Sequence, residues 1–520
     1  MNVHLGSNPS LSKRSSGLLL HPTSLPGPHG SGDLGPEARR FIDFLAAAGQ
    51  SWWQMLPTGP PGYGESPYSA QSAFAGSPLL ISPDRLVAKG WLDGAATRPP
   101  SALRTDRVEY PPMAAHRMRL LAESFDRWRS RGRDPHFFSF CDRKATWLDD
   151  FALFRALKDA HGGAPWARWD AKVRKRDSAA LSAARTELAG AIEFEKFVQY
   201  VFDQQWAELR AYAAERGVAL IGDIPIFVAH DSAEVWNDPG SFYLDAEGEP
   251  TFVAGVPPDY FSSVGQRWGN PLYRWKRMKR DGYRWWADRL RTMLERFDAI
   301  RIDHFVGFHR YWRIPASEPT AVRGRWMKGP GSGFFVAMKE TLGRLPLVAE
   351  DLGAVTPAVF ALRDEFKIPG IKILQFAFGS DPHAYTFLPH NYPRRAIAYT
   401  GTHDNDTTVG WFHDRGGGSS TRNAAQAEAE RQAARQYLGT NGDEIHWDMI
   451  RAAWASVARV AIAPVQDVLG LGSEARMNRP GTASGNWAWR MDEGSLQPIH
   501  AERLSAMTKA YGRTKSKGEA

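Results

Sequence analysis

Short apolar runs alternate with longer segments of helical periodicity along most of this sequence. This alternation is typical of βα units that build a parallel sheet covered by helices. Eight apolar runs have the length of buried strands, at residues 17–21, 51–56, 218–223, 299–304, 345–350, 370–376, 396–402 and 457–464. We therefore predict the α/β class and a (β/α)8 (TIM) barrel with large insertions between its strands.

The predicted barrel carries two long insertions within a single expected catalytic domain, residues 1–520. The connection between the second and third strands is far longer than one crossover helix needs. We expect residues 85–190 to form a mostly helical inserted subdomain there, and residues 227–278 to form a loop insertion over the active-site mouth. The residues from about Tyr511 onward are expected to be disordered.

Four predicted strands end abruptly in polar side chains. These are Asp223 after the third strand, Asp303 and His304 after the fourth, Glu350 after the fifth, and His403 and Asp404 after the seventh. Active sites of parallel barrels form where the strands end, so we expect these residues to meet at one mouth. Strand alternation also places Arg301 on the same face as Asp303. An arginine there would keep the carboxylate ionised and oriented, as a nucleophile requires; a structural ion pair is the alternative.

Asp303 and Glu350 end adjacent predicted strands, which lie about 4.8 Å apart in a sheet. Glycoside cleavage through a covalent intermediate needs two carboxyl groups about 5 Å apart, so this pair is a candidate nucleophile and acid/base. The apolar neighbours Leu347, Val348 and Leu352 are expected to raise the pKa of Glu350. The adjacent Asp351 would point to the opposite face, and we interpret it as structural.

Asp404 would complete the wall of the site, where His403 and His304 can bind sugar hydroxyls or make structural hydrogen bonds. A metal-dependent barrel hydrolase uses the same residue types and is an alternative. The sequence has neither the His-x-His nor the His-Glu-x-x-His spacing, so we predict no metal and no cofactor.

The net charge of +8 and the pI near 9.4 raise the possibility of an anionic partner. The basic residues are dispersed, however, so we predict no nucleic-acid binding. The 20 tryptophans suit sugar stacking, although most aromatic residues of a chain this size belong to its core. Cys141 is the only cysteine and leaves no intramolecular disulfide. We see no signal peptide or membrane-spanning segment and predict a cytoplasmic protein.

Several long motifs carry a resemblance to a known family. They are GLLLHPTSL at 17–25, SPY at 66–68, GDIPIFV at 222–228, GVPPDY at 255–260, WGNPLY at 268–273, RIDH at 301–304, AEDLG at 349–353, GTHDN at 401–405 and RMN at 476–478. With them the chain resembles the 4-α-glucanotransferases, or amylomaltases, of glycoside hydrolase family 77 in the α-amylase clan. The resemblance runs from about residue 16 to residue 490.

The resemblance implies roles for particular residues. It makes Asp303 the nucleophile, Glu350 the acid/base and Asp404 the carboxylate that stabilises the transition state. It further implies a set of substrate-binding residues, namely Asp223, Arg301, His304, His403 and Tyr68 on the donor side, Tyr260 and Phe261 in a loop over the acceptor subsites, and Asn478.

The implied activity is transfer of α-1,4-glucan segments to the 4-hydroxyl of glucose or another glucan, by a retaining double displacement. Maltooligosaccharides and other α-1,4-glucans would be the substrates, with glucose as an acceptor. An α-glucan hydrolase with the same carboxylates and a noncatalytic glycan-binding protein are the alternatives. The chain is expected to be a monomer or a homodimer.

Overall fold

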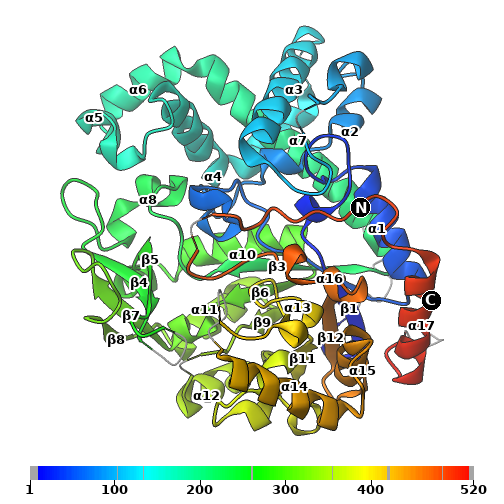
Figure 1. The fold of residues 1–520 in the computed structure, drawn as a ribbon. Helices are drawn as coiled ribbons and strands as arrows, with labels where there is room; N and C mark the ends of the chain where they lie inside the picture. The colour runs from blue at the N-terminus through cyan, green and yellow to red at the C-terminus, as the bar shows by residue number, and fades with distance from the viewer. Residues whose placement is uncertain are drawn as a thin grey trace.

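Eight parallel strands close into a barrel in the order β1-β12-β11-β10-β9-β6-β3-β2 (Figure 1). The computed structural model describes residues 10–101, 103–132, 134–258, 262–353, 355–417, 422–482 and 484–514. The barrel strands are β1 (Ser15–Leu19), β2 (Trp52–Gln54), β3 (Ala219–Pro225), β6 (Ala299–Asp303), β9 (Leu347–Ala349), β10 (Gly370–Ile373), β11 (Ala396–Tyr399) and β12 (Val460–Pro464). Each overlaps one predicted strand, and the predicted (β/α)8 barrel is confirmed.

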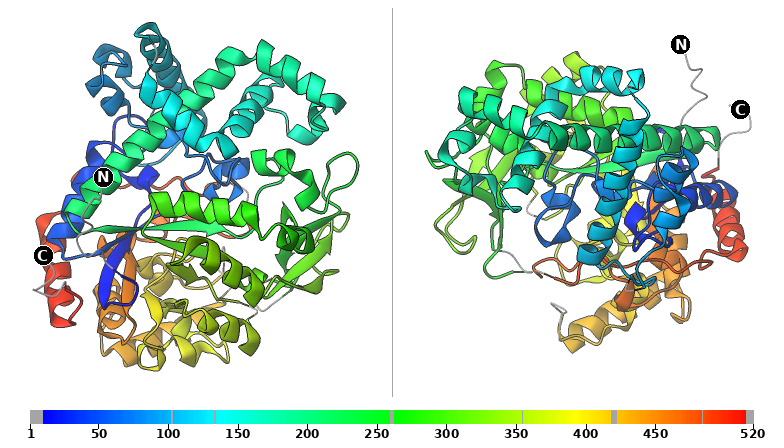
Figure 2. Two further views of the ribbon diagram at one scale, coloured as in Figure 1. Left: turned by 180° about the vertical axis from the view of Figure 1, so that it is seen from behind. Right: turned by 90° about the horizontal axis from the view of Figure 1, so that it is seen from above.

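The described helices surround the barrel or build its insertions (Figure 2). They are α1 (Pro36–Ala47), α2 (Pro83–Ala88), α3 (Tyr110–Ser130), α4 (Pro135–Ala160), α5 (Ala171–Arg174), α6 (Ser178–Glu187), α7 (Ala189–Glu215), α8 (Ala233–Asn237), α9 (Trp275–Arg280), α10 (Arg284–Arg296), α11 (Ser332–Leu342), α12 (Pro357–Glu365), α13 (Thr408–His413), α14 (Ala424–Leu438), α15 (Ile445–Ala455), α16 (Val465–Val468) and α17 (Pro498–Ala510). Within these described helices, none is long and apolar enough to cross a membrane.

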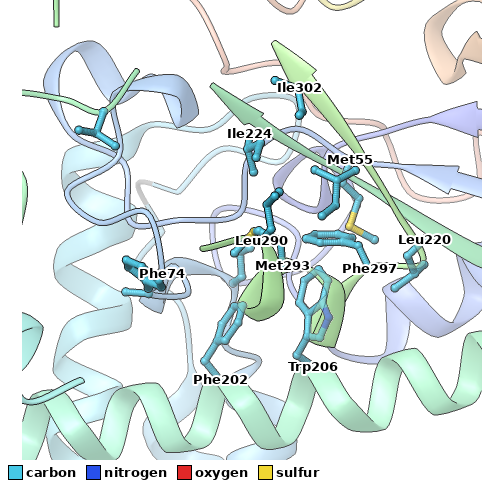
Figure 3. Close-up of a cluster of buried hydrophobic side chains, with 14 of the residues drawn as sticks. Met55, Phe74, Phe202, Trp206, Leu220, Ile224, Leu290, Met293, Phe297 and Ile302 are labelled. Carbon is cyan, nitrogen blue, oxygen red and sulfur yellow. The ribbon is translucent and has the colours of Figure 1, made fainter. Parts of the chain in front are cut away.

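The strands are held by apolar packing on both faces. Ile224 of β3 and Ile302 of β6 point outward into a buried apolar cluster (Figure 3). The cluster also contains Leu290 of α10, Phe297 directly after α10, and Trp206 of α7. On the inner face another buried cluster, which includes side chains of β3, β9, β10 and β11, fills the barrel. Burial on both faces explains why these strands read as nearly continuous apolar runs.

Residues 85–190, expected to be mostly helical, carry α3, α4, α5 and α6, which gather on one side of the barrel (Figure 1). The long helix α7 follows them and leads into β3. The indole of Trp206 in α7 donates to the carbonyl of Arg296 (3.0 Å), at the end of α10. Helix α7 therefore connects the inserted helices to the outer layer of the barrel.

Residues 227–278 differ from the expected loop, because the structure builds them from α8, β4 (Phe252–Val256), β5 (Gln266–Pro271) and α9. The two strands join β7 (Arg310–Pro315) and β8 (Arg325–Lys328) in an antiparallel sheet of order β5-β4-β7-β8. Strand β4 pairs with β7, which follows β6 in the chain. Its other partner, β5, is the next strand along the chain, but β7 lies beyond β6, so local periodicity gave no sign of the complete sheet.

The expectation of disorder from about Tyr511 is wrong at Arg513, which is fully buried. Its guanidinium donates to carbonyls at and just beyond the C-terminal end of α15, those of Trp454 (2.7 Å) and Ala458 (3.0 Å). It also donates to the carbonyl of Ser15 in β1 (2.8 Å). A cation at this position satisfies carbonyls that the helix leaves unpaired. Arg513 therefore anchors this part of the chain to the barrel, while residues 515–520 lie outside the described residues.

Replacing Arg513 with Ala should destabilise the protein by about 3 kcal/mol, because several buried carbonyls lose their donor. Thermal unfolding measured by calorimetry checks this, with Lys509→Ala on the exposed face of α17 as the control. Equal unfolding temperatures for the two variants would show that the hydrogen bonds of Arg513 do not stabilise the fold.

Candidate active site

The polar strand ends meet at the carboxyl end of the barrel. In the register of β3 and β6, Asp223 lies beside Arg301 and Pro225 lies beside Asp303. Ala349 of β9 is paired with Ile302 of β6, so Glu350 follows on the strand next to Asp303. Neighbouring parallel strands thus bring these side chains together, although they are far apart in sequence.

Arg301 connects the two aspartates. Its Nη1 donates to both carboxylate oxygens of Asp223, at 2.8 and 2.7 Å, and its Nη2 lies 2.9 Å from Oδ1 of Asp303. The side chains of Arg301 and Asp223 are 5% and 0% exposed, whereas that of Asp303 is 31% exposed. Burial lowers the pKa of Arg301, but the two carboxylates overcome this and hold that pKa well above its ordinary value. The buried pair therefore orients an accessible carboxylate.

Glu350 lies in a different electrostatic setting. Burial raises the pKa of its carboxyl from the ordinary 4.5 to about 8, and nearby Asp303 adds to the rise. The backbone N–H groups of His304 (2.8 Å) and Leu352 (2.9 Å) donate to its two oxygens and partly oppose this shift. Glu350 is therefore mainly protonated at neutral pH. The neighbouring Asp351 accepts from Arg363 and from the N–H of Ile371, as its structural interpretation expects.

His304 turns the chain sharply at the end of β6, with a left-handed backbone (φ 57°). This turn directs its N–H to Glu350 and places its ring edge-on to Trp268, with ring centres 4.7 Å apart. Burial lowers the pKa of His304 to about 4, against the influence of Asp303, so the ring is neutral. Its buried Nε2 has no hydrogen-bond partner among the described residues. The ring is thus free to bond a polar ligand group.

The opposite wall is built around Asp404, whose side chain is 43% exposed. Asn478 Nδ2 donates to its Oδ1 (2.6 Å), and His403 Nε2 lies 3.4 Å from its Oδ2. Arg476 donates through Nη2 to the backbone carbonyl of Asp404 (2.7 Å) and through Nε to that of Asn478 (2.7 Å). The third carboxylate is therefore fixed through both its side chain and its backbone.

Tyr68 joins the two walls. Its ring stacks on His403 with centres 5.2 Å apart, and its hydroxyl donates to Asp223 (2.8 Å). Contacts therefore run without a break from Asp404 through His403, Tyr68 and Asp223 to Arg301 and Asp303.

Most sequence-predicted site residues thus converge on one mouth, and the exceptions are instructive. Tyr260 and Phe261 lie outside the described residues. Arg476 and Trp487 contact site residues but were not among the candidates; Arg476 had a signal in its RMN motif, while Trp487 had none. Searched within the described ranges, no group of three His, Cys, Asp or Glu residues is placed to hold a metal ion.

Comparisons with known proteins identify the family of this chain. A family model described as 4-alpha-glucanotransferase matches residues 20–496. The 4-alpha-glucanotransferase of Thermus thermophilus is 51% identical over 511 residues, which cover 96% of this chain and 99% of that protein. The chain belongs to the 4-alpha-glucanotransferase family. The Synechocystis 4-alpha-glucanotransferase is 48% identical and covers 97% of this chain and 99% of its own.

A solved amylomaltase from Streptococcus agalactiae, in complex with acarbose, superposes on this member of the 4-alpha-glucanotransferase family with a TM-score of 0.91. It is 36% identical, and the match covers 97% of this chain and all of that one. The resemblance inferred from the motifs is confirmed. This 4-alpha-glucanotransferase is accordingly a transferase that acts on glucans.

The raised pKa of Glu350 makes stability depend on pH. A carboxyl that ionises near 4.5 when unfolded and near 8 when folded favours the folded state most at low pH, and this contribution is lost as pH rises to about 8. Glu350→Gln cannot ionise, so its unfolding temperature minus that of the wild type should rise between about pH 4.5 and pH 8 and then level off. Calorimetric scans of both proteins across this pH range test the prediction. A difference in unfolding temperature that does not change with pH would refute the raised pKa of Glu350.

Proposed function

We propose that this 4-alpha-glucanotransferase works by a retaining double displacement, with Asp303 as nucleophile, Glu350 as acid/base and Asp404 as the carboxylate that stabilises the transition state. One observation carries the proposal. Two carboxyls end adjacent strands, and burial raises the pKa of one to about 8 while Arg301 orients the other. Environments that separate two carboxyl groups in this way suit an acid and a nucleophile.

In the first step, Asp303 attacks C1 of the donor-side glucose while Glu350 gives its proton to the departing 4-oxygen. The C1–oxygen bond of the glucan breaks, a bond from C1 to the Asp303 carboxylate forms, and the leaving segment departs with a hydroxyl. Asp404 faces the same mouth and supports the positive charge that develops on the sugar ring.

In the second step, Glu350 acts as a base. It takes the proton of an incoming 4-hydroxyl, whose oxygen attacks C1 and displaces Asp303. Two inversions restore the original α configuration, and both carboxyl groups return to their starting protonation states. Backbone N–H donors at both Glu350 oxygens support the ionised form that this step starts from.

We assign substrate binding to the polar groups that surround the pair: Asp223, Arg301, His304, His403, Tyr68 and Asn478. The neutral His304 ring suits a sugar hydroxyl, since no described residue bonds its Nε2. A complex of the Streptococcus agalactiae amylomaltase with acarbose supports α-1,4-glucans as substrates. Glucose would serve as the smallest acceptor.

Transfer rather than hydrolysis requires that a sugar hydroxyl outcompete water for the intermediate. We propose that Tyr260 and Phe261 form an acceptor platform, as the resemblance of their loop to the family implies; Tyr260 closes the GVPPDY motif and Phe261 follows it. A hydrolase would share the carboxylates, and a noncatalytic glycan binder would share the aromatic residues. The family membership favours transfer over both.

The remaining proposals concern the domain organisation, cellular location and oligomeric state of the enzyme. We propose one catalytic domain, with residues 85–190 as an inserted subdomain, and a cytoplasmic location, which the single cysteine supports. A monomer and a homodimer both fit the proposed chemistry, because every proposed catalytic group comes from one chain.

Asp303→Asn should reduce glucan transfer by about 10⁴-fold or more, since the amide cannot form the covalent bond. Incubation with maltotriose measures this: the wild type should yield glucose and a ladder of longer oligosaccharides. Asp126→Asn, on the exposed surface of α3, is the control. Substantial transfer by Asp303→Asn would sink the proposed mechanism.

Tyr260→Ala should raise the share of hydrolysis products from maltotriose, because a weakened acceptor site admits water to the intermediate. The ratio of oligosaccharide ladder to glucose plus maltose reports the outcome. An unchanged ratio would remove this loop from the account of transfer.

A further inference from the structure

The strap, which we define as residues 484–491, crosses the barrel mouth between the inserted helices and the barrel, in orange-red in Figure 1. It is hydrogen-bonded to three other segments of the chain, two of them remote in sequence. The N–H of Trp487 donates to Met477 (2.7 Å), the N–H of Val108 donates to Ala488 (2.7 Å), and the N–H of Met491 donates to Ser24 (2.8 Å). The strap is therefore a fixed part of the mouth.

Trp487 in this strap has a left-handed backbone, with φ at 62°. Such a conformation is strained for a bulky residue and persists only where the surroundings enforce it. Here two hydrogen bonds do so, since the Trp487 N–H donates to Met477 and the Tyr110 hydroxyl donates to the Trp487 carbonyl (3.0 Å). His304, within the active site, shares the left-handed conformation.

The indole of Trp487 completes a cluster of three rings. Its centre lies 5.8 Å from that of Tyr68 and 5.9 Å from that of His403. Tyr68 and His403 stack on each other at 5.2 Å and contact Asp223 and Asp404 respectively. Trp487 itself is only 5% exposed, so it supports the two rings without presenting a surface of its own to the substrate.

We propose that Trp487 is a positioning residue, which uses a strained backbone to hold the stacked Tyr68 and His403 in place for the donor-side sugar. The role of the two rings in sugar binding rests on the proposed function. The indole contacts both rings at a tilt, with interplanar angles of 44° to Tyr68 and 39° to His403, and so limits how far either ring can turn. Their polar atoms are then already directed at the carboxylates.

Trp489 provides a matched comparison on the same strap. It is half-buried and pairs with Arg107 in an isolated antiparallel bridge. Within the described part of the chain it makes no ring contact with Tyr68 or His403, in contrast to Trp487. Substitutions at both positions remove the same side chain from the same segment, but only one of them removes support from the candidate site.

The experiment compares kcat and KM for maltotriose in Trp487→Leu, Trp487→Phe and the matched Trp489→Leu and Trp489→Phe variants. Circular dichroism and thermal unfolding establish the folded fraction of each preparation. A purely structural defect lowers the folded fraction, which reduces apparent kcat and leaves KM unchanged. Lost positioning acts on the folded enzyme, so it should raise KM and lower kcat together.

We expect Trp487→Leu to lose about 10²-fold in kcat/KM, with a raised KM, and Trp487→Phe to recover most of this because it keeps a flat ring. Both Trp489 variants should keep the wild-type KM. Equal kinetic losses at the two positions, or a wild-type KM in Trp487→Leu, would overturn the proposal. If Trp487→Leu does not fold, the phenylalanine pair decides: a rise of about threefold in KM for Trp487→Phe alone supports the proposal, and equal KM values refute it.

This outcome is separable from the catalytic assignment. Activity retained by Asp303→Asn would defeat the proposed mechanism, whereas the difference in KM between the two tryptophan positions bears on Trp487 alone.

Discussion

The buried contact of Arg301 with Asp223 and Asp303 is the interaction on which the candidate site depends. Two carboxylates and one guanidinium share the end of two adjacent strands, and two of the three side chains are almost completely removed from water. Burying a lone charge there would be costly, so the cation and its bidentate partner must fold together. Asp303 is the member left partly exposed, and its orientation follows from the fixed position of Arg301.

The remaining groups extend this arrangement around the mouth. Tyr68 links Asp223 to His403, and His403 approaches Asp404. The left-handed turn at His304 delivers a backbone N–H to Glu350, and its imidazole Nε2 has no hydrogen-bond partner in the part of the chain that the structure describes. The barrel thus supplies rigid positions for the carboxyl groups, while segments remote in sequence supply their orientation.

Features that depend on local pattern were predictable from sequence. The barrel strands are buried on both faces and end in polar residues, so both the strands and the site residues at their ends could be located. The pairing of Arg301 with Asp303 followed from strand alternation, as did the structural place of Asp351. Apolar neighbours also indicated the direction of the Glu350 pKa shift, which burial causes. Strand ends were less certain: the sixth predicted strand stops at Ile373, where the chain turns into a 3-10 helix.

Features that depend on remote partners were not predictable. Strand β5 is largely exposed and contains Gly269 and Pro271, and its sheet includes strands that follow β6 in the chain. Arg513 is buried because carbonyls at the end of α15 need a hydrogen-bond donor. The polar composition of the C-terminal residues gives no sign of this requirement. The proposed role of Trp487 depends on two rings that local sequence does not connect with it. One is that of Tyr68, hundreds of positions earlier, and the other is that of His403, which follows β11.

The most direct test of the central claim is to trap the intermediate. A maltosyl fluoride donor needs no proton from Glu350 when fluoride leaves, whereas breakdown of the intermediate needs Glu350 as base. Glu350→Gln mixed with this donor should therefore accumulate a glycosylated protein, and mass spectrometry of its peptides should place the sugar on Asp303. A label on another residue, or consumption of the fluoride with no label at all, would contradict the account.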